Sequence, residues 1–304
     1  MLALAPGYHA RPATGDDVDA IHAVEAASQL QILGRVETDR DDIVAVFARD
    51  GIDLAADTVV VADPTGAPAA WAWVNRRSDV TVHPEHRGRG LGGALLEWAE
   101  NRARDAGTAA IVQSVPDLDA AATALVRAHG YRPKVTSWML GIDTDGQPPA
   151  EAGPVTIRAY DPADGAAAHR VTQDAFADWN PRRLSYQEWA RHTVGRSSFA
   201  PWASPMAFDG DALVGAAIGL MIPERGEGYI ESLAVSREHR GRGIATALLR
   251  HAFAAFAAHG HRHCTLWTHS DTGALALYQR VGMAIERATT VWSKALSDPP
   301  PRSR

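Results

Sequence analysis

The sequence contains very little cysteine and lysine, and it has no long apolar run. Cys264 is the one cysteine among 304 residues, which excludes an internal disulfide and a structural zinc site built from cysteines. Because no stretch of about 18 apolar residues occurs, no membrane-spanning helix is expected. The first residues, MLALAPGYHARP, lack the basic start and long apolar core of a secretion signal. These absences predict a cytoplasmic protein.

The charge is small and unevenly divided. Two lysines, Lys134 and Lys294, stand among 30 basic residues, and the 36 acidic residues give a formal net charge of −6. This balance argues against a non-specific nucleic-acid binder. Residues 1–152 carry 13 basic and 22 acidic residues, whereas residues 153–304 carry 17 and 14. An anionic ligand is therefore expected to favour the second half.

The chain contains one segment twice. Residues 80–100 (VTVHPEHRGRGLGGALLEWAE) align with residues 233–253 (LAVSREHRGRGIATALLRHAF), and further matches open and close each half. A repeat of about 150 residues is too long for a solenoid unit and indicates a duplicated domain. We expect the following division of the chain: N-terminal domain 1–142, linker 143–153, C-terminal domain 154–296 and disordered tail 297–304.

Both halves predict the same order of elements, β-α-α-β-β-β-α-β-α-β, which is an α/β unit around a mixed sheet. In the first half, helices are expected near 16–29, 39–49, 88–106 and 117–129. In the second half, Ser185 and Glu188 predict a capping box for the helix 184–194. The other elements of the second half are expected as strands at 154–160, 228–235, 261–269 and 287–296, a hairpin at 206–222, and helices at 161–179, 241–260 and 271–282.

A glycine- and arginine-rich segment lies between a strand and a long helix in each copy. Glycines let the backbone approach a ligand, and the free N–H groups of a helix start bind phosphate oxygens. The pattern predicts a phosphate-containing ligand. Gly88, Gly90 and Gly93 also match a dinucleotide fingerprint, but the second copy has Thr246 in place of the third glycine. A Walker A loop is excluded because the chain has no Gly-Lys-Ser/Thr.

Two spaced motifs identify a family. Arg240-x-x-Gly243-x-Ala245 and Arg87-x-x-Gly90-x-Gly92 resemble the pyrophosphate-binding signature of the GNAT acetyltransferases. The segment from Asp271 to Met283 resembles the helix that packs along coenzyme A and supplies a tyrosine. The resemblance covers both halves and implies two tandem GNAT folds, each with a mixed, mostly antiparallel sheet flanked by helices. It also implies acetyl-CoA as co-substrate, no metal, and these coenzyme-binding residues: Leu233, Ala234, Val235, Arg240, Gly241, Arg242, Gly243, Ile244, Ala245, Thr246, Asp271 and Ala274 in the second half, and Val80, Val82, Arg87, Gly88, Arg89, Gly90 and Gly92 in the first.

The resemblance also implies catalytic roles. In this family the strand before the loop bulges, here over Leu233–Val235, and its N–H groups face the acetyl carbonyl. Glu231 would be the general base and Tyr278 the general acid. The first half has Ser78 in place of Glu231, with Asp79 adjacent, and Val126 in place of Tyr278. We therefore expect a catalytic C-terminal domain and a degenerate N-terminal one.

The expected activity is transfer of an acetyl group from acetyl-CoA to a primary amine of a small molecule. The two-domain architecture is similar to that of the mycothiol synthases, a branch of the family. A mycothiol precursor, an aminoglycoside-like antibiotic and a protein N-terminus all remain open as acceptors. A non-catalytic acyl-CoA-binding or regulatory module is the alternative. We expect no nucleic-acid or membrane partner, and either a monomer, whose two domains form an intramolecular pseudo-dimer, or a weak homodimer.

Ordinary structural roles also account for several of these residues. Tyr278 has the helical spacing of a core residue, and Glu231 fits a solvated strand position. His259, His261 and His263 allow a metal site, although a solvated turn explains them better. Five aromatic residues fall where helices should cover the acceptor, and core packing explains most of them: Trp179, Tyr186, Trp189, Phe199 and Trp202.

Overall fold

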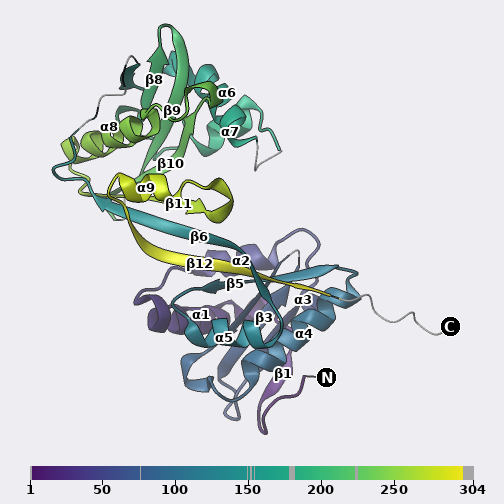
Figure 1. The fold of residues 1–304 in the computed structure, drawn as a ribbon. Helices are drawn as coiled ribbons and strands as arrows, with labels where there is room; N and C mark the ends of the chain where they lie inside the picture. The colour runs from purple at the N-terminus through teal and green to yellow at the C-terminus, as the bar shows by residue number, and fades with distance from the viewer. Residues whose placement is uncertain are drawn as a thin grey trace. The chain divides into compact units, whose positions relative to one another are not determined.

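A computed structural model describes residues 2–75, 77–148, 150, 153, 155–177, 182–222 and 225–296. The predicted tail 297–304, Trp179 and part of the predicted linker lie outside these residues. The chain forms two compact units (Figure 1). One unit comprises residues 1–136 and 288–304, and the other comprises residues 137–287. No helix in the described ranges is long and apolar enough to cross a membrane.

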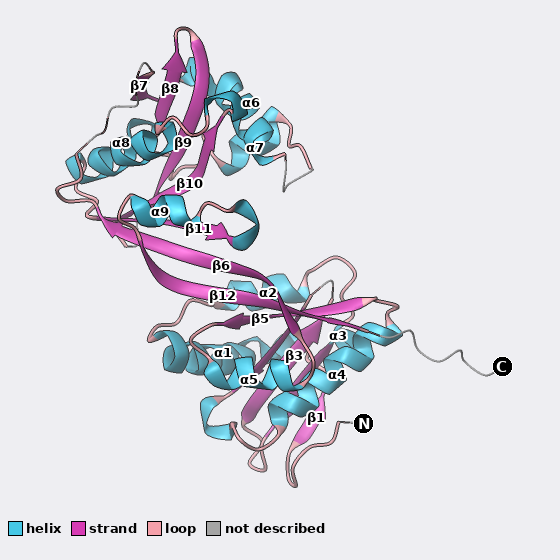
Figure 2. Ribbon diagram, viewed as in Figure 1, coloured by secondary structure: helices cyan, strands magenta, loops and turns pink. Residues whose placement is uncertain are grey.

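The N-terminal unit has a sheet in the order β1-β2-β3-β4-β5-β12 (Figure 2). The β4–β5 pair is parallel, and the other pairs are antiparallel. Its strands are β1 (His9–Arg11), β2 (Thr58–Ala62), β3 (Pro68–Val74), β4 (Ser78–Val82), β5 (Ala110–Pro116) and part of β12 (Ala284–Ala295). Its helices are α1 (Val18–Leu33), α2 (Arg40–Phe47), α3 (Leu54–Asp57), α4 (Leu91–Asp105) and α5 (Ala120–Ala128).

The C-terminal unit repeats this plan in the order β6-β11-β10-β9-β8-β7. Again one pair, β10–β11, is parallel. Its strands are β7 (Thr156–Ala159), β8 (Pro205–Asp209), β9 (Ala212–Ile222), β10 (Glu227–Val235), β11 (His263–His269) and part of β6 (Arg132–Asp143). Its helices are α6 (Gly165–Phe176), α7 (Tyr186–His192), α8 (Ile244–Ala258) and α9 (Leu275–Arg280). The predicted α/β class and mixed, mostly antiparallel sheets are confirmed.

The two units exchange their last strands. Residues 289–295 of β12 pair with β5, and residues 137–143 of β6 pair with β11. The compact units therefore divide the chain differently from the continuous halves 1–142 and 154–296 expected from the repeat. The repeat could not reveal the exchange, because two copies of one strand pattern offer each sheet an equivalent last strand.

The long helices hold each unit together through one apolar face. Phe253 and Phe256 of α8 are completely buried against the C-terminal sheet. Burying each of these rings contributes roughly 1.5–3 kcal/mol. Leu91 and Leu95 of α4 make the corresponding contacts in the N-terminal unit. The capping box predicted for α7 is confirmed, because the Glu188 amide donates to Ser185 Oγ and the Ser185 amide to the Glu188 carboxylate.

Candidate active site

A β-bulge interrupts β10 at Glu231. The register against β9 shifts between Ile230 and Ser232, so Glu231 is an extra residue on the strand. Ile230 and Leu233 both contact the core under α8. The two residues between them, Glu231 and Ser232, therefore belong to the opposite face of the sheet. We expected the bulge within Leu233–Val235. It lies just before that stretch, and those three residues pair regularly with β9.

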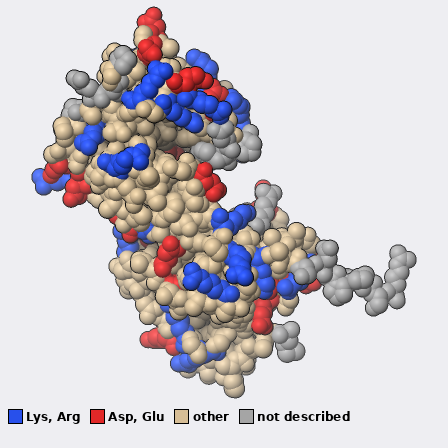
Figure 3. All heavy atoms as spheres, in the orientation of Figure 1, with Lys and Arg blue, Asp and Glu red and all other residues tan. Residues whose placement is uncertain are grey.

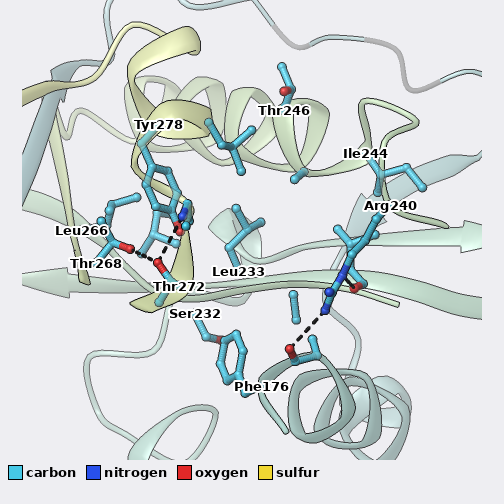
Figure 4. A pocket seen from close by; sticks show the side chains of 18 of the residues that line it. Phe176, Ser232, Leu233, Arg240, Ile244, Thr246, Leu266, Thr268, Thr272 and Tyr278 are labelled. Atoms are coloured by element: carbon cyan, nitrogen blue, oxygen red, sulfur yellow. Dashed lines mark hydrogen bonds between the residues drawn. The ribbon is translucent and has the colours of Figure 1, made fainter. Parts of the chain in front are cut away.

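A pocket opens where β10 and β11 separate. Their parallel register runs from Gly228 to Ile230, whose partner is Leu266, and among the described residues it ends there. Beyond this point lies a cavity of about 870 Å³, bounded by β10, β11 and the starts of α8 and α9 (Figure 4). A strand edge without a ladder partner keeps backbone N–H groups available for a ligand. Such groups can stabilise an oxygen that becomes negative during acyl transfer.

Most of the residues predicted for the C-terminal site line this one cavity. Arg242 is the exception. The lining residues that the sequence predicted are Glu231, Leu233, Ala234, Val235, Arg240, Gly241, Gly243, Ile244, Ala245, Thr246, Asp271, Ala274 and Tyr278.

The glycine-rich loop has the geometry of an anion site. Gly241 and Gly243 have φ angles of +77° and +80°, a left-handed conformation that favours glycine. Because these residues cannot continue a right-handed helix, α8 begins at Ile244 and not at the predicted residue 241. The loop therefore ends on a helix N-terminus whose first N–H groups are free to bind phosphate oxygens.

Arg240 fixes this loop to its surroundings. Its Nε donates to the Val235 carbonyl at 3.3 Å, and its Nη2 donates to the Ala175 carbonyl at 3.1 Å. The guanidinium thus joins the end of β10 to the end of α6 (Figure 4). Both of these partners are neutral carbonyls, and among the described residues no carboxylate forms an ion pair with Arg240.

Tyr278 lies on α9 at the wall of the cavity. Its side chain is 8% exposed and belongs to the core cluster under α8, as expected for a core residue of an amphipathic helix. Tyr278 also lines the cavity, so the same side chain packs in the core and borders the proposed site. Burial raises the pKa of Tyr278 to about 12. The phenol therefore stays protonated at neutral pH and can donate a proton.

Glu231 has a pKa raised above its ordinary value. Partial loss of water around the carboxyl is the main cause, and electrostatic interactions with Arg196 and His192 oppose it. A carboxylate with a raised pKa is a stronger base than an ordinary glutamate. Its position on the bulge, at the cavity, suits proton transfer.

The structure adds residues that the sequence analysis did not single out. Ala175 and Phe176 reach the cavity from the end of α6, and Trp267 and Thr268 reach it from β11. Thr272 organises the turn before α9: it donates to the His269 carbonyl, accepts from the Ala274 amide and lies 2.8 Å from Thr268 Oγ1. No motif in the sequence singles out these five residues as part of a site.

The corresponding strand of the N-terminal unit has no bulge. β4 pairs with β3 without a shift from Ser78 to Val82. Ser78, in place of Glu231, donates to the Val112 carbonyl and accepts from Gln113. Asp79 is desolvated and lies near the Glu25 carboxyl, and both effects raise its pKa to about 7. Val126, in place of Tyr278, is a buried core residue.

The arginines of the N-terminal loop have partners from the same chain. Arg87 Nη2 lies 3.3 Å from a carboxylate oxygen of Asp119, and Arg89 Nη1 donates to the Tyr8 hydroxyl at 2.8 Å. In the C-terminal unit Asp271, the counterpart of Asp119, is 61% exposed and lies 3.9 Å from His269. A Cβ at Gly92 would lie 2.9 Å from Leu125 Cδ2, so α5 packs closely on the start of α4.

Two of the three histidines considered for a metal lie against the same tryptophan, and the third lies beside a carboxylate. His259 stacks on Trp202 with ring centroids 3.7 Å apart, and His261 stacks on the same ring at 5.8 Å. His263 Nε2 lies 2.8 Å from the Glu286 carboxylate. In the part of the chain that the structure describes, no group of three or more His, Cys, Asp or Glu is arranged to hold a metal.

Comparison with known proteins places this site in a family. The model of the "Acetyltransferase (GNAT) family" matches residues 166–283, and that of the "Acetyltransferase (GNAT) domain" matches residues 42–133. A mycothiol acetyltransferase of Clavibacter sepedonicus is 30% identical over 270 residues, which are 79% of this chain and 83% of the relative. The chain belongs to the GNAT acetyltransferase family.

Two further similarities agree with this assignment. A mycothiol acetyltransferase of Corynebacterium glutamicum (strain R) is 27% identical over 71% of this chain and 75% of the relative. The solved structure of a GCN5-related N-acetyltransferase from Sphaerobacter thermophilus aligns over 97% of both chains with a TM-score of 0.75 and 28% identity. The protein therefore has two GNAT domains in tandem, as the repeat predicted, and is an acetyl-CoA-dependent N-acetyltransferase, as the resemblance implied.

Proposed function

We propose that the C-terminal unit transfers the acetyl group of acetyl-CoA to a primary amine of a small molecule. One observation carries the proposal: the Glu231 bulge and the Tyr278 phenol border the same cavity, beside a glycine-rich loop that ends on a helix N-terminus. The N-terminal unit lacks the bulge, the glutamate and the tyrosine. It retains the glycine-rich loop as a structural element.

Each part of the site has a role in the reaction. The loop around Gly241 and Gly243, with Arg240 and Arg242, binds the phosphates of the coenzyme. Glu231 takes a proton from the amine, directly or through water, so that the nitrogen attacks the thioester carbon. Backbone N–H groups of β10 beyond Ile230 stabilise the oxyanion. The carbon–sulfur bond then breaks, and Tyr278 donates its proton to the leaving sulfur.

The acceptor is the open part of this proposal. Relatives named mycothiol acetyltransferase make a mycothiol precursor one candidate. An aminoglycoside-like antibiotic and a protein N-terminus are others. A competing function is that of a non-catalytic acyl-CoA-binding module, which would bind acetyl-CoA and turn over no amine.

Release of the coenzyme A thiol, measured over a panel of amines, tests the proposal. Wild type is expected to release thiol in the presence of at least one amine. Glu231→Gln should lower kcat by roughly a hundredfold or more. The matched control is Asp79→Asn in the N-terminal unit, which should leave kcat unchanged. Full turnover by Glu231→Gln, or loss of turnover in Asp79→Asn, would contradict the assignment of catalysis to the C-terminal unit.

A further inference from the structure

A guanidinium without a carboxylate partner lies just beyond α7, on the side of the sheet that carries Glu231. Arg196 Nε donates to Ser198 Oγ at 3.4 Å, and among the described residues no carboxylate lies within ion-pair distance of it. Figure 3 shows basic side chains gathered on one face of the C-terminal unit, with acidic side chains among them. Two arginines close to Arg196 in sequence differ from it in this respect. Arg182 pairs with Glu188 at 3.2 Å and Arg183 with Asp174 at 2.8 Å. The positive charge of Arg196 is therefore available to bind an anionic ligand.

The backbone before Arg196 is shaped by a turn that requires glycine. The amides of Thr193 and Gly195 both donate to the carbonyl of Ala190, which ends α7 sharply. A Cβ at Gly195 would lie 2.8 Å from that carbonyl oxygen. A side chain at residue 195 would therefore open the turn and move Arg196.

The backbone after Arg196 is fixed on the sheet. Phe199 forms a bridge with Leu220 of β9, and Leu220 in turn pairs with Tyr229 of β10. The Ala200 amide donates to the Gly219 carbonyl, and the Met221 amide to the Ser198 carbonyl. Arg196 therefore lies in a turn three residues before a bridge to β9, the strand that neighbours β10.

Glu231 lies on this same side of the sheet. Ile230 and Leu233 face α8, so Glu231 and Ser232 belong to the face that α6 and α7 cover. The positive charge of Arg196 lowers the pKa of both Glu231 and Tyr229 against the effect of burial. The guanidinium is therefore near enough to influence both side chains, although Arg196 is not among the described residues that line the cavity.

We propose that Arg196 is an anion-binding subsite for the acceptor, and that the acceptors of this enzyme are amines that also carry a carboxylate or phosphate group. The proposal rests on the proposed function, because it takes Glu231 as the base that receives the amine proton. An amine at Glu231 and an anion at Arg196 hold the acceptor at two points. A charge-assisted bond of this kind is lost when the anion is replaced by a neutral group. The excess of basic residues in the second half of the sequence favours the same ligand.

Matched pairs of amines test the subsite. β-Alanine is compared with β-alaninamide, and O-phosphoethanolamine with ethanolamine, by thiol release at saturating acetyl-CoA. Wild type should show a KM for the acid on the order of tenfold lower than for its neutral partner. Comparing the carboxylate pair with the phosphate pair shows which anion is preferred. Arg196→Gln should remove this difference by raising the KM of the acid alone, and Arg196→Lys should retain part of it.

Arg262→Gln is the control for the loss of one positive charge. Arg262 is 84% exposed in the same unit, and this variant should keep the wild-type preference. A second measurement needs no turnover: with coenzyme A present, the acid but not its neutral partner should raise the Tm of wild type and of Glu231→Gln, and neither should raise that of Arg196→Gln. If wild type treats acid and neutral amine alike in both measurements, or responds to neither, the subsite is wrong. If Glu231→Gln keeps full turnover while the preference for acids remains, the catalytic assignment fails and the subsite stands.

Discussion

The Lys294 ammonium lies 2.6 Å from a carboxylate oxygen of Glu100, although 194 positions separate the two residues. Glu100 is on α4 and its side chain is 6% exposed, whereas Lys294 is on β12 at the other end of the chain. Arg104 approaches the same oxygen at 3.3 Å. One of the two lysines of the protein thus fastens the exchanged strand into the N-terminal unit.

Lys294→Met should weaken the N-terminal unit. The substitution leaves the buried Glu100 carboxylate with Arg104 as its charged partner, and losing one member of a buried pair costs about 3–5 kcal/mol when no other partner remains. With Arg104 still present, we expect the free energy of unfolding to fall by about 2–3 kcal/mol. Urea unfolding followed by tryptophan fluorescence measures this change. Arg35→Gln, which breaks the more exposed pair with Glu37, is the control and should cost less than about 1 kcal/mol.

Tyr278→Phe should lower kcat and leave the Kd for acetyl-CoA nearly unchanged. The ring remains to fill the core under α8, while the proton donor is lost. The expected fall in kcat is roughly a hundredfold. Thiol release and calorimetric binding of acetyl-CoA give the two constants separately. An equal loss of binding and turnover would show that Tyr278 acts through packing alone.

The activity should decline in acid because of Glu231. The raised pKa means that the carboxylate takes up its proton at a higher pH than an ordinary glutamate does. A general base works only when unprotonated, so kcat/KM is full above this pKa and falls as the pH drops through it. The pKa of Tyr278, about 12, adds no loss at neutral or mildly alkaline pH. A pH profile of kcat/KM from 4.5 to 9 checks this, and residual activity of Glu231→Gln should lack the acid limb.

One molecule of acetyl-CoA should bind per chain. In the N-terminal loop the cationic groups of Arg87 and Arg89 are engaged by Asp119 and Tyr8, and β4 lacks the bulge. Calorimetry on the full chain should give a stoichiometry near one. Arg240→Gln should weaken the affinity by about tenfold, as expected for loss of a charge-assisted bond to phosphate. Arg87→Gln should change the affinity for acetyl-CoA little. A wild-type stoichiometry of two would contradict the prediction that only the C-terminal unit binds acetyl-CoA.

Asp79 should make stability depend on pH. Its pKa in the folded protein is about 7, above the ordinary value of 3.8, so folding favours the protonated form. The stabilisation is complete below the unfolded pKa and is lost as the pH rises through about 7. Asp79→Asn should therefore raise the free energy of unfolding at pH 8, by an amount on the order of 1–2 kcal/mol, and change it little at pH 4. Urea unfolding at both pH values gives the comparison, and an equal change at the two would contradict the assignment.

The sequence by itself determined the family, the duplication and most of the residues that line the cavity of the C-terminal unit. These features depend on contiguous residues: the glycine pattern from Gly241 to Ala245 dictates a loop followed by a helix start, and the copied pattern from Arg87 to Gly92 dictates a second one. Glu231 and Tyr278 were proposed as site residues from the family resemblance, and the helix α8 and the strand β11 separate the elements that carry them.

Only the tertiary structure decided which strands complete which sheet and which groups meet across the sheets. Backbone pairing carries no residue code that distinguishes β6 from β12, so the exchange became visible only in the register. Glu231 lies at the bulge on the face opposite α8, the Arg87 guanidinium pairs with Asp119 in one unit, and Asp271, the counterpart of Asp119, lies near His269 in the other. These relationships are set by side chains that are distant in sequence, whose contacts exist only once the units have packed.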